Sequence, residues 1–414
     1  MDDFKKPAKK LRLEPSDNFN TPKVNADDHD FSQNTPPIHG NFDIPTVNLD
    51  EIPPHKEPKE GKMKNFFNWI GTNKKISIPV ITLCLIALIG AGYFFLFNKD
   101  EQSQSTSTKA VVVKKQEEKK ITSPLTGRTL TNAELAKRPV TSLMIENSPD
   151  ARPQSGLSEA DMVVEAIAEG GITRFMAVYQ ESQPQYIGPI RSSRPYYLDY
   201  ALPLESSYGH VGGSPQALQD IKSLGVRDLD QFFNADTYWR ITERFAPHNV
   251  YTSFEKLDKA NQTKGFTSSK FTGFERKQDV RQTPTAKTID FAISGPLYSP
   301  RFEYDQTNNS YNRFQDSGPH TDQKSGKQIS PKVVVALVIN SGNDPDGYHS
   351  AYNTSGTGAV YVFQDGVVTE GTWSKTDRKS PLVLTDKNGL PIKLNSGQTW
   401  ISLVGTSSDI TYKP

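Results

Sequence analysis

The apolar positions of this 414-residue chain form one long uninterrupted run and many short ones. The long run begins at Ile76, ends at Phe97 and contains about 22 residues, none of them charged. At a rise of about 1.5 Å per residue, such a helix crosses a bilayer core of about 30 Å. The pattern therefore predicts a single transmembrane helix over residues 76–97.

The charges on either side of this run predict its orientation. Five lysines crowd its N-terminal side, whereas Asp100 and Glu101 follow its C-terminal end: the lysines are Lys59, Lys62, Lys64, Lys74 and Lys75. Because basic flanks stay in the cytoplasm, residues 1–75 are predicted to be a cytoplasmic tail. That tail is rich in Pro, Asn, Asp and Lys, which predicts disorder, and the polar residues 98–121 are predicted to be an extracytoplasmic linker.

The remaining chain has the short apolar runs of a folded body. Residues 162–179 could form a helix, but Gly170-Gly171 between two β-branched runs favours a hairpin. With those glycines as the loop, Glu165 would face Met176 and lie diagonally to Arg174 on the same face. Residues 122–265 are therefore predicted to be a mixed α/β domain.

The C-terminal part of the body has a different pattern. Residues 266–290 are predicted to be a linker or long loop, since they are mostly polar and contain several glycines. Residues 291–414 contain strand-like runs separated by Asp365-Gly366 and Asn388-Gly389, both strong hairpin signals. The predicted fold class is thus α+β: a disordered tail, a single transmembrane helix, a mixed α/β domain and a mostly antiparallel β domain.

Composition removes several function classes. The only cysteine, Cys84, lies inside the apolar run, so the body has no disulfide and no cysteine-based metal cluster or nucleophile. The formal net charge is +1 and no dense basic run is interleaved with aromatics, so nucleic acid is not an expected partner. The histidines of the body are scattered singly, and neither a metal site nor a cofactor is predicted.

Several long motifs resemble those of the YerB-like envelope lipoproteins. They are MIENSPDARPQSGLSEADMVVEAIAEGGITRFMAVYQ at 144–180, IGPIRSSRPYYLDYA at 187–201, HVGGSPQA at 210–217, YNRF at 311–314, PHTD at 319–322, DGVVTEGTW at 365–373 and LNSGQTW at 394–400. The resemblance implies an extracytoplasmic protein anchored at the bacterial cell membrane, with an N-terminal and a C-terminal domain. It implies no activity and no catalytic residue, and this chain departs from the lipoprotein pattern in its long tail and apolar run.

The richest group of candidate site residues lies in the N-terminal domain. Gly212 and Gly213 precede a helix that Ser214 can cap, and the free N–H groups of such a helix start attract anions. Guanidinium groups bind carboxylate or phosphate bidentately. The predicted anion pocket consists of Glu165, Arg174, Arg191, Arg194, His210, Gly212, Gly213 and Ser214. The alternative is that the arginines form internal ion pairs with Glu146, Glu165 and Asp199.

Two functions remain open from the sequence. The first is a binding or scaffolding protein that recognises an anionic cell-envelope polymer or an envelope protein through this pocket. The second is a hydrolase or transferase acting on a peptidoglycan-type polymer, with Glu165 as acid or base and His210 or His248 as proton shuttle. No G-x-S-x-G, H-E-x-x-H or Walker motif supports the second.

Overall fold

The computed structural model describes residues 120–344 and 347–414, which all belong to one compact unit. The predicted tail, the predicted transmembrane segment and nearly all of the predicted linker lie outside the described residues. Among the described residues, no helix is long and apolar enough to cross a membrane.

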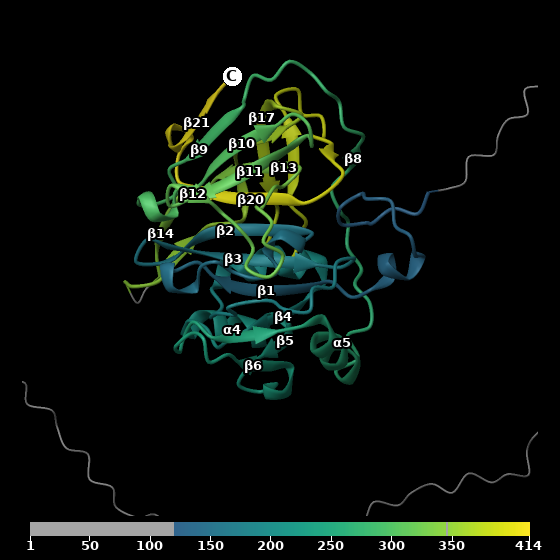
Figure 1. The fold of residues 1–414 in the computed structure, drawn as a ribbon, viewed down its shortest axis with the longest axis vertical. Helices are drawn as coiled ribbons and strands as arrows, with labels where there is room; N and C mark the ends of the chain where they lie inside the picture. Colours follow the sequence, from purple (N-terminus) through teal and green to yellow (C-terminus); the bar gives the residue numbers. More distant parts are fainter. Residues whose placement is uncertain (1–119, 345–346) are drawn as a thin grey trace, which may run out of the picture. The chain divides into compact units, whose positions relative to one another are not determined.

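The body is organised around a ten-stranded sheet in the order β18-β17-β16-β13-β20-β2-β3-β1-β4-β5 (Figure 1). Its strands in chain order are β1 (Thr141–Glu146), β2 (Met162–Glu169), β3 (Ile172–Tyr179), β4 (Ser207–His210), β5 (Arg227–Asp230), β13 (Val333–Val338), β16 (Gly356–Gln364), β17 (Val367–Lys375), β18 (Val383–Asp386) and β20 (Thr399–Val404). The N-terminal and C-terminal parts of the described body therefore share one sheet.

This shared sheet corrects the predicted fold class. The predicted fold class was α+β, with a disordered tail, a single transmembrane helix, a mixed α/β domain and a mostly antiparallel β domain, but no helix of the described residues can span a membrane. Instead, the described body is mostly sheet, and β20 lies between β13 and β2 and runs parallel to both. Parallel pairing between strands more than 200 residues apart leaves no local turn signal, so the hairpin pattern alone could not reveal it.

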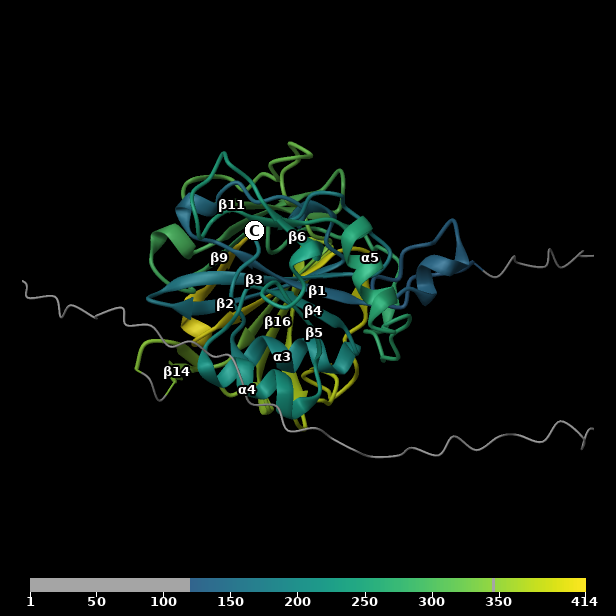
Figure 2. The same cartoon turned by 90° about the horizontal axis from the view of Figure 1, so that it is seen from below.

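Three α-helices and a second sheet cover the two faces of the large sheet. Helices α3 (Pro195–Ala201) and α4 (Pro215–Leu224) pack on one face, where Tyr197 and Ile221 belong to the same buried hydrophobic cluster as Val164. The opposite face carries α5 (Phe254–Thr263) and a five-stranded sheet (Figure 2). That sheet consists of β9 (Thr288–Phe291), β10 (Arg301–Asp305), β11 (Ser310–Gln315), β12 (Gly318–Pro319) and β21 (Ile410–Lys413).

Three small two-stranded sheets complete the body. They are β6 (Tyr238–Arg240) with β7 (Val250–Thr252), β8 (Arg276–Lys277) with β19 (Leu394–Asn395), and β14 (Ser341–Asn343) with β15 (Ser350–Tyr352). The segment predicted to be a linker contains β8 and the beginning of β9. Through β8 it pairs with the C-terminal part of the chain.

Local signals placed several elements correctly. Helix α4 begins at Pro215, where the hydroxyl of Ser214 accepts from the N–H of Ala217, and it ends at the left-handed Gly225. The hairpin at Gly170-Gly171 is confirmed, with Glu169 opposite Ile172. The hairpin signal at Asp365-Gly366 is also confirmed, because Gln364 pairs with Val367.

The register of the first hairpin differs from the prediction by one residue. A β-bulge between Ile167 and Glu169 shifts the pairing, so that Glu165 lies opposite Phe175 instead of Met176, and Ala166 lies opposite Arg174. Because side chains alternate along a strand, this single residue moves Glu165 and Arg174 to opposite faces of the sheet. The predicted diagonal pair is wrong.

Candidate functional site

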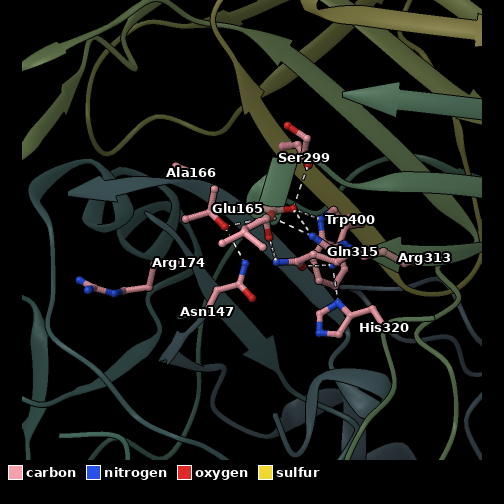
Figure 3. Close-up of polar contacts among 12 residues, drawn as sticks. Asn147, Glu165, Ala166, Arg174, Ser299, Arg313, Gln315, His320 and Trp400 are labelled. Atoms are coloured by element: carbon pink, nitrogen blue, oxygen red, sulfur yellow. Dashed lines mark hydrogen bonds and ion pairs between the residues drawn. The ribbon is translucent and has the colours of Figure 1, made fainter. Parts of the chain in front are cut away.

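Glu165 lies at the centre of a fully buried polar cluster (Figure 3). Its carboxylate accepts two hydrogen bonds from Nη2 of Arg313, at 2.9 and 3.0 Å, and one from Nε1 of Trp400 at 3.0 Å. Thr173 and Ser402 donate at 3.3 and 3.4 Å. Figure 3 also shows Arg174 pointing away from this cluster. The cluster links β2 to β11 and β20, and thus the two halves of the chain.

Arg313 is surrounded by aromatic rings and by the partners of its second nitrogen. Its guanidinium carbon lies 4.6 Å from the ring centre of Trp400, and its Nη1 donates to Gln315 and to His320. Burial lowers the pKa of Arg313, and the charge of Glu165 opposes that shift. The charges of Glu165 and Arg313 compensate each other, and neither side chain is exposed to solvent. The pair therefore connects β2 to β11, and Glu165 has no access to a substrate.

The hydrogen bonds of His320 define its protonation state. Nδ1 accepts from Arg313, while Nε2 lies 2.8 Å from Oε1 of Gln154 and must donate to it. Only the neutral ring with a proton on Nε2 satisfies both bonds. Complete burial, and then the charges of Arg313 and Arg152, lower the pKa of His320 well below its ordinary value.

This neutral histidine predicts acid sensitivity. In the unfolded chain His320 takes up a proton below about pH 6.5, whereas the folded protein excludes it. The unfolded state therefore binds more protons, and from this group the free energy of unfolding should fall by about 1.4 kcal/mol per pH unit below that point. Denaturant titrations from neutral to mildly acidic pH measure how the free energy of unfolding changes with pH in the natural protein and in His320→Gln. His320→Gln should have a flatter slope, and an unchanged slope would contradict the assignment.

Two of the predicted arginines come together on the opposite face of the sheet. Nη2 of Arg174 donates to Oε1 of Glu169 at 2.7 Å, and Nη2 of Arg194 donates to Oε2 of the same carboxylate at 2.5 Å. Each arginine also donates to a backbone carbonyl, of Ser192 and Ser193 respectively. The structure thus forms an arginine cluster, defined as Arg174, Arg194 and Glu169.

The arginine cluster contains more positive than negative charge. Both arginine side chains are at most 5% exposed, while Glu169 is 12% exposed, so the cluster lies just beneath the surface. The buried Nε atoms of both arginines have no hydrogen-bond partner. Burial and then the charge of Arg174 lower the pKa of Arg194, and Glu169 only partly offsets them. One carboxylate does not neutralise two guanidinium groups.

Arg191 belongs to a neighbouring group at the C-terminal end of β1. Its Nε lies 3.4 Å from Oε1 of Glu146, and Nδ1 of His248 lies 3.0 Å from both oxygens of that carboxylate. The Arg191 side chain is 26% exposed, which makes it the most accessible of the three predicted arginines. The internal pairing of Arg191 with Glu146 follows the alternative that the sequence left open.

The helix start and His210 have partners within the protein. Nδ1 of His210 lies 2.7 Å from the carbonyl of Gly212, and Nε2 lies 3.0 Å from Asp228. The N–H of Gly212 donates to Asp230 at 3.0 Å. Gly213 approaches Ser193 closely, because a Cβ there would lie 3.2 Å from Cβ of Ser193. Gly213, one of the predicted pocket residues, therefore lies beside Ser193, the residue that precedes Arg194. Glu165 does not lie with these residues.

Sequence reasoning missed Glu169 and Arg313. Glu169 directly precedes the Gly170-Gly171 loop and has no motif of its own, although the hairpin brings its carboxylate to both arginines. Arg313, His320 and Trp400 lie in three of the motifs that resemble the YerB-like family, and these motifs meet at Glu165. Asp199, which the sequence offered as an arginine partner, pairs with Arg378 instead. No three His, Cys, Asp or Glu side chains of residues 120–344 and 347–414 are grouped to hold a metal.

Two consecutive parts of the described body match one protein family. Residues 125–267 match the N-terminal domain and residues 289–401 the C-terminal domain of a family described as protein of unknown function (DUF3048). The chain belongs to this family, and the resemblance to YerB-like proteins is confirmed.

A particular relative is the putative lipoprotein YerB of Bacillus subtilis (strain 168). It is 31% identical over 333 residues, which are 78% of this chain and 95% of the relative. The crystal structure of the YerB protein matches with a TM-score of 0.64 and 29% identity, covering 71% of this chain and 100% of that one.

Proposed function

We propose that this chain is a membrane-anchored, extracytoplasmic protein of the cell envelope, and that it binds an anionic envelope ligand through the arginine cluster and Arg191. The location is supported by the name of the relative YerB, a putative lipoprotein. The observation that carries the binding proposal is the charge imbalance of two buried guanidinium groups that share the carboxylate of Glu169.

Burying an uncompensated charge is costly, so this arrangement favours a second anion. Carboxylate and phosphate oxygens are the acceptors that match guanidinium donors, and the buried Nε atoms of Arg174 and Arg194 have no hydrogen-bond partner within the described residues. Arg191 supplies an accessible cation on the chain segment that leads to Arg194. The ligand class is therefore a polymer or protein carrying phosphate or carboxylate groups.

A catalytic role has less support from the geometry. Glu165 is fully buried and ion-paired with Arg313, and His210 is fully buried with both ring nitrogens near acceptors. Neither side chain can reach a polymer outside the protein. The binding function is thus preferred over the hydrolase or transferase.

Sedimentation with cell-wall sacculi tests the proposal. Full-length protein in mild detergent should sediment with native sacculi at low salt and should be released by added salt, because exposed charge contacts are screened. Sacculi stripped of phosphate polymers with hydrofluoric acid distinguish the ligand's source. Loss of binding would identify the phosphate polymers, and retained salt-sensitive binding would identify wall carboxylates. No sedimentation on either preparation would overturn recognition of a wall polymer.

Protease treatment of intact cells tests the location. An extracytoplasmic body should be cut by protease added outside, while a cytoplasmic marker protein stays intact. Protection of the body in cells that become sensitive only after lysis would contradict the proposed location.

A further inference from the structure

The hairpin of β14 and β15 has an exposed outer edge. Within the part of the chain that the structure describes, β14 pairs only with β15, and all three of its residues are exposed. A backbone bridge between Glu169 and His349 ties the hairpin to the end of β2. This places β15 on the inside and β14 on the outside of a small extension of the sheet.

The hydrogen-bond register shows which backbone groups of β14 point outward. The N–H of Asp344 donates to the carbonyl of His349 at 2.8 Å, so these two residues form a hydrogen-bonded pair. In an antiparallel ladder such pairs alternate, which makes Gly342 and Ala351 the next one. The N–H and C=O groups of Ser341 and Asn343 therefore face away from β15, and no described backbone group pairs with them.

A groove of 610 Å³ lies between this hairpin and the tip of the β2–β3 hairpin. Its walls come from Gly170 and Gly171 on one side and from β14, Gly347 and Tyr348 on the other, and none of the lining residues carries a charge. A Cβ added to Gly170, Gly342 or Gly347 would meet nothing within 4 Å, so these glycines border open space. Tyr348, which also lines the groove, is 65% exposed.

We propose that β14 is a docking edge for an extended, uncharged peptide segment of a partner protein. An extended peptide presents alternating N–H and C=O groups that match those of Ser341 and Asn343, so it can be added as a further strand. Every second side chain of the added strand would lie on the face that carries the groove. The uncharged lining and the glycine walls suit small or β-branched side chains. None of the residues that line the groove belongs to the arginine cluster, although the backbone of Glu169 bridges to the hairpin.

Peptide binding with matched substitutions tests this inference. The probe is a fluorescein-labelled octapeptide of alternating threonine and valine with blocked ends, followed by anisotropy with full-length protein in detergent. Asn343→Pro removes one outward N–H but no bond to β15, and it should weaken binding at least about tenfold. Asn343→Ala keeps that N–H and should bind as the natural protein does. Ser341→Pro removes the outward N–H of Ser341 at the same edge and should also weaken binding of the peptide.

Three outcomes would overturn the inference. The first is no anisotropy change at millimolar protein, and the second is unchanged binding by both proline variants. The third is displacement of the peptide by a tetramer of N-acetylglucosamine together with loss of binding in Asn343→Ala. That result would indicate a glycan site that uses the Asn343 side chain.

Discussion

Replacing Arg313 with methionine should destabilise the protein by about 3–5 kcal/mol, because it leaves the carboxylate of Glu165 buried without its partner. Both side chains of this pair are 0% exposed, so water cannot replace the lost hydrogen bonds. The free energy of unfolding from denaturant titration measures the effect. A loss below about 1 kcal/mol, typical of exposed ion pairs, would contradict the structural role assigned to the pair.

Two further variants separate charge from packing. Glu165→Gln combined with Arg313→Met removes both charges and keeps an acceptor for Trp400, so it should recover much of the lost stability. Arg301→Met breaks the ion pair with Asp290, in which Arg301 is 53% exposed, and should cost less than about 1 kcal/mol. Equal losses in all three proteins would indicate a nonspecific effect of substitution.

The second large effect is expected for Glu169→Gln. This substitution should lower the free energy of unfolding and should increase the stabilisation of the protein by added anions. Without the shared carboxylate, Arg174 and Arg194 repel each other in a buried site, which should cost about 3 kcal/mol. An anion that binds only the folded state would restore stability, by about 2.7 kcal/mol at one hundred times its dissociation constant. Millimolar pyrophosphate should therefore raise the melting temperature of Glu169→Gln more than that of the natural protein.

A surface substitution provides the control for this effect. Glu370→Gln removes the carboxylate that pairs with the exposed Lys387, so it should change stability by less than about 0.5 kcal/mol. Pyrophosphate should stabilise this variant and the natural protein equally. If pyrophosphate raises all three melting temperatures by the same amount, the arginine cluster is not the anion site.

Local chemistry predicted the turns and helix ends of this body, and long-range pairing escaped prediction. Gly170-Gly171 and Asp365-Gly366 specify hairpins through their own backbone preferences, and Ser214 and Gly225 specify the ends of α4. The parallel contact of β2 with β20 has no such signal. Consequently the sequence indicated many of the elements but not the ten-stranded sheet that joins the N-terminal and C-terminal parts of the body.

The candidate site was predicted in part for the same reason. The anion-binding chemistry of guanidinium groups predicts a site at Arg174 and Arg194, and the structure brings these two side chains together. An unbroken hairpin register predicts Glu165 on the same face as Arg174, whereas the bulge after Ile167 moves it to the other face. Arg313 could not be assigned to Glu165, because 148 residues separate them in the chain.

The affinity of two arginine variants for sacculi decides whether the arginines recognise an envelope anion. At low salt, Arg191→Ala and Arg194→Ala should each bind native sacculi about tenfold more weakly than the natural protein, since each loses a charge-assisted contact. Arg301→Ala, which removes an exposed arginine of β10, should bind normally. If both variants fold and sediment as the natural protein does, the arginines do not bind the envelope ligand.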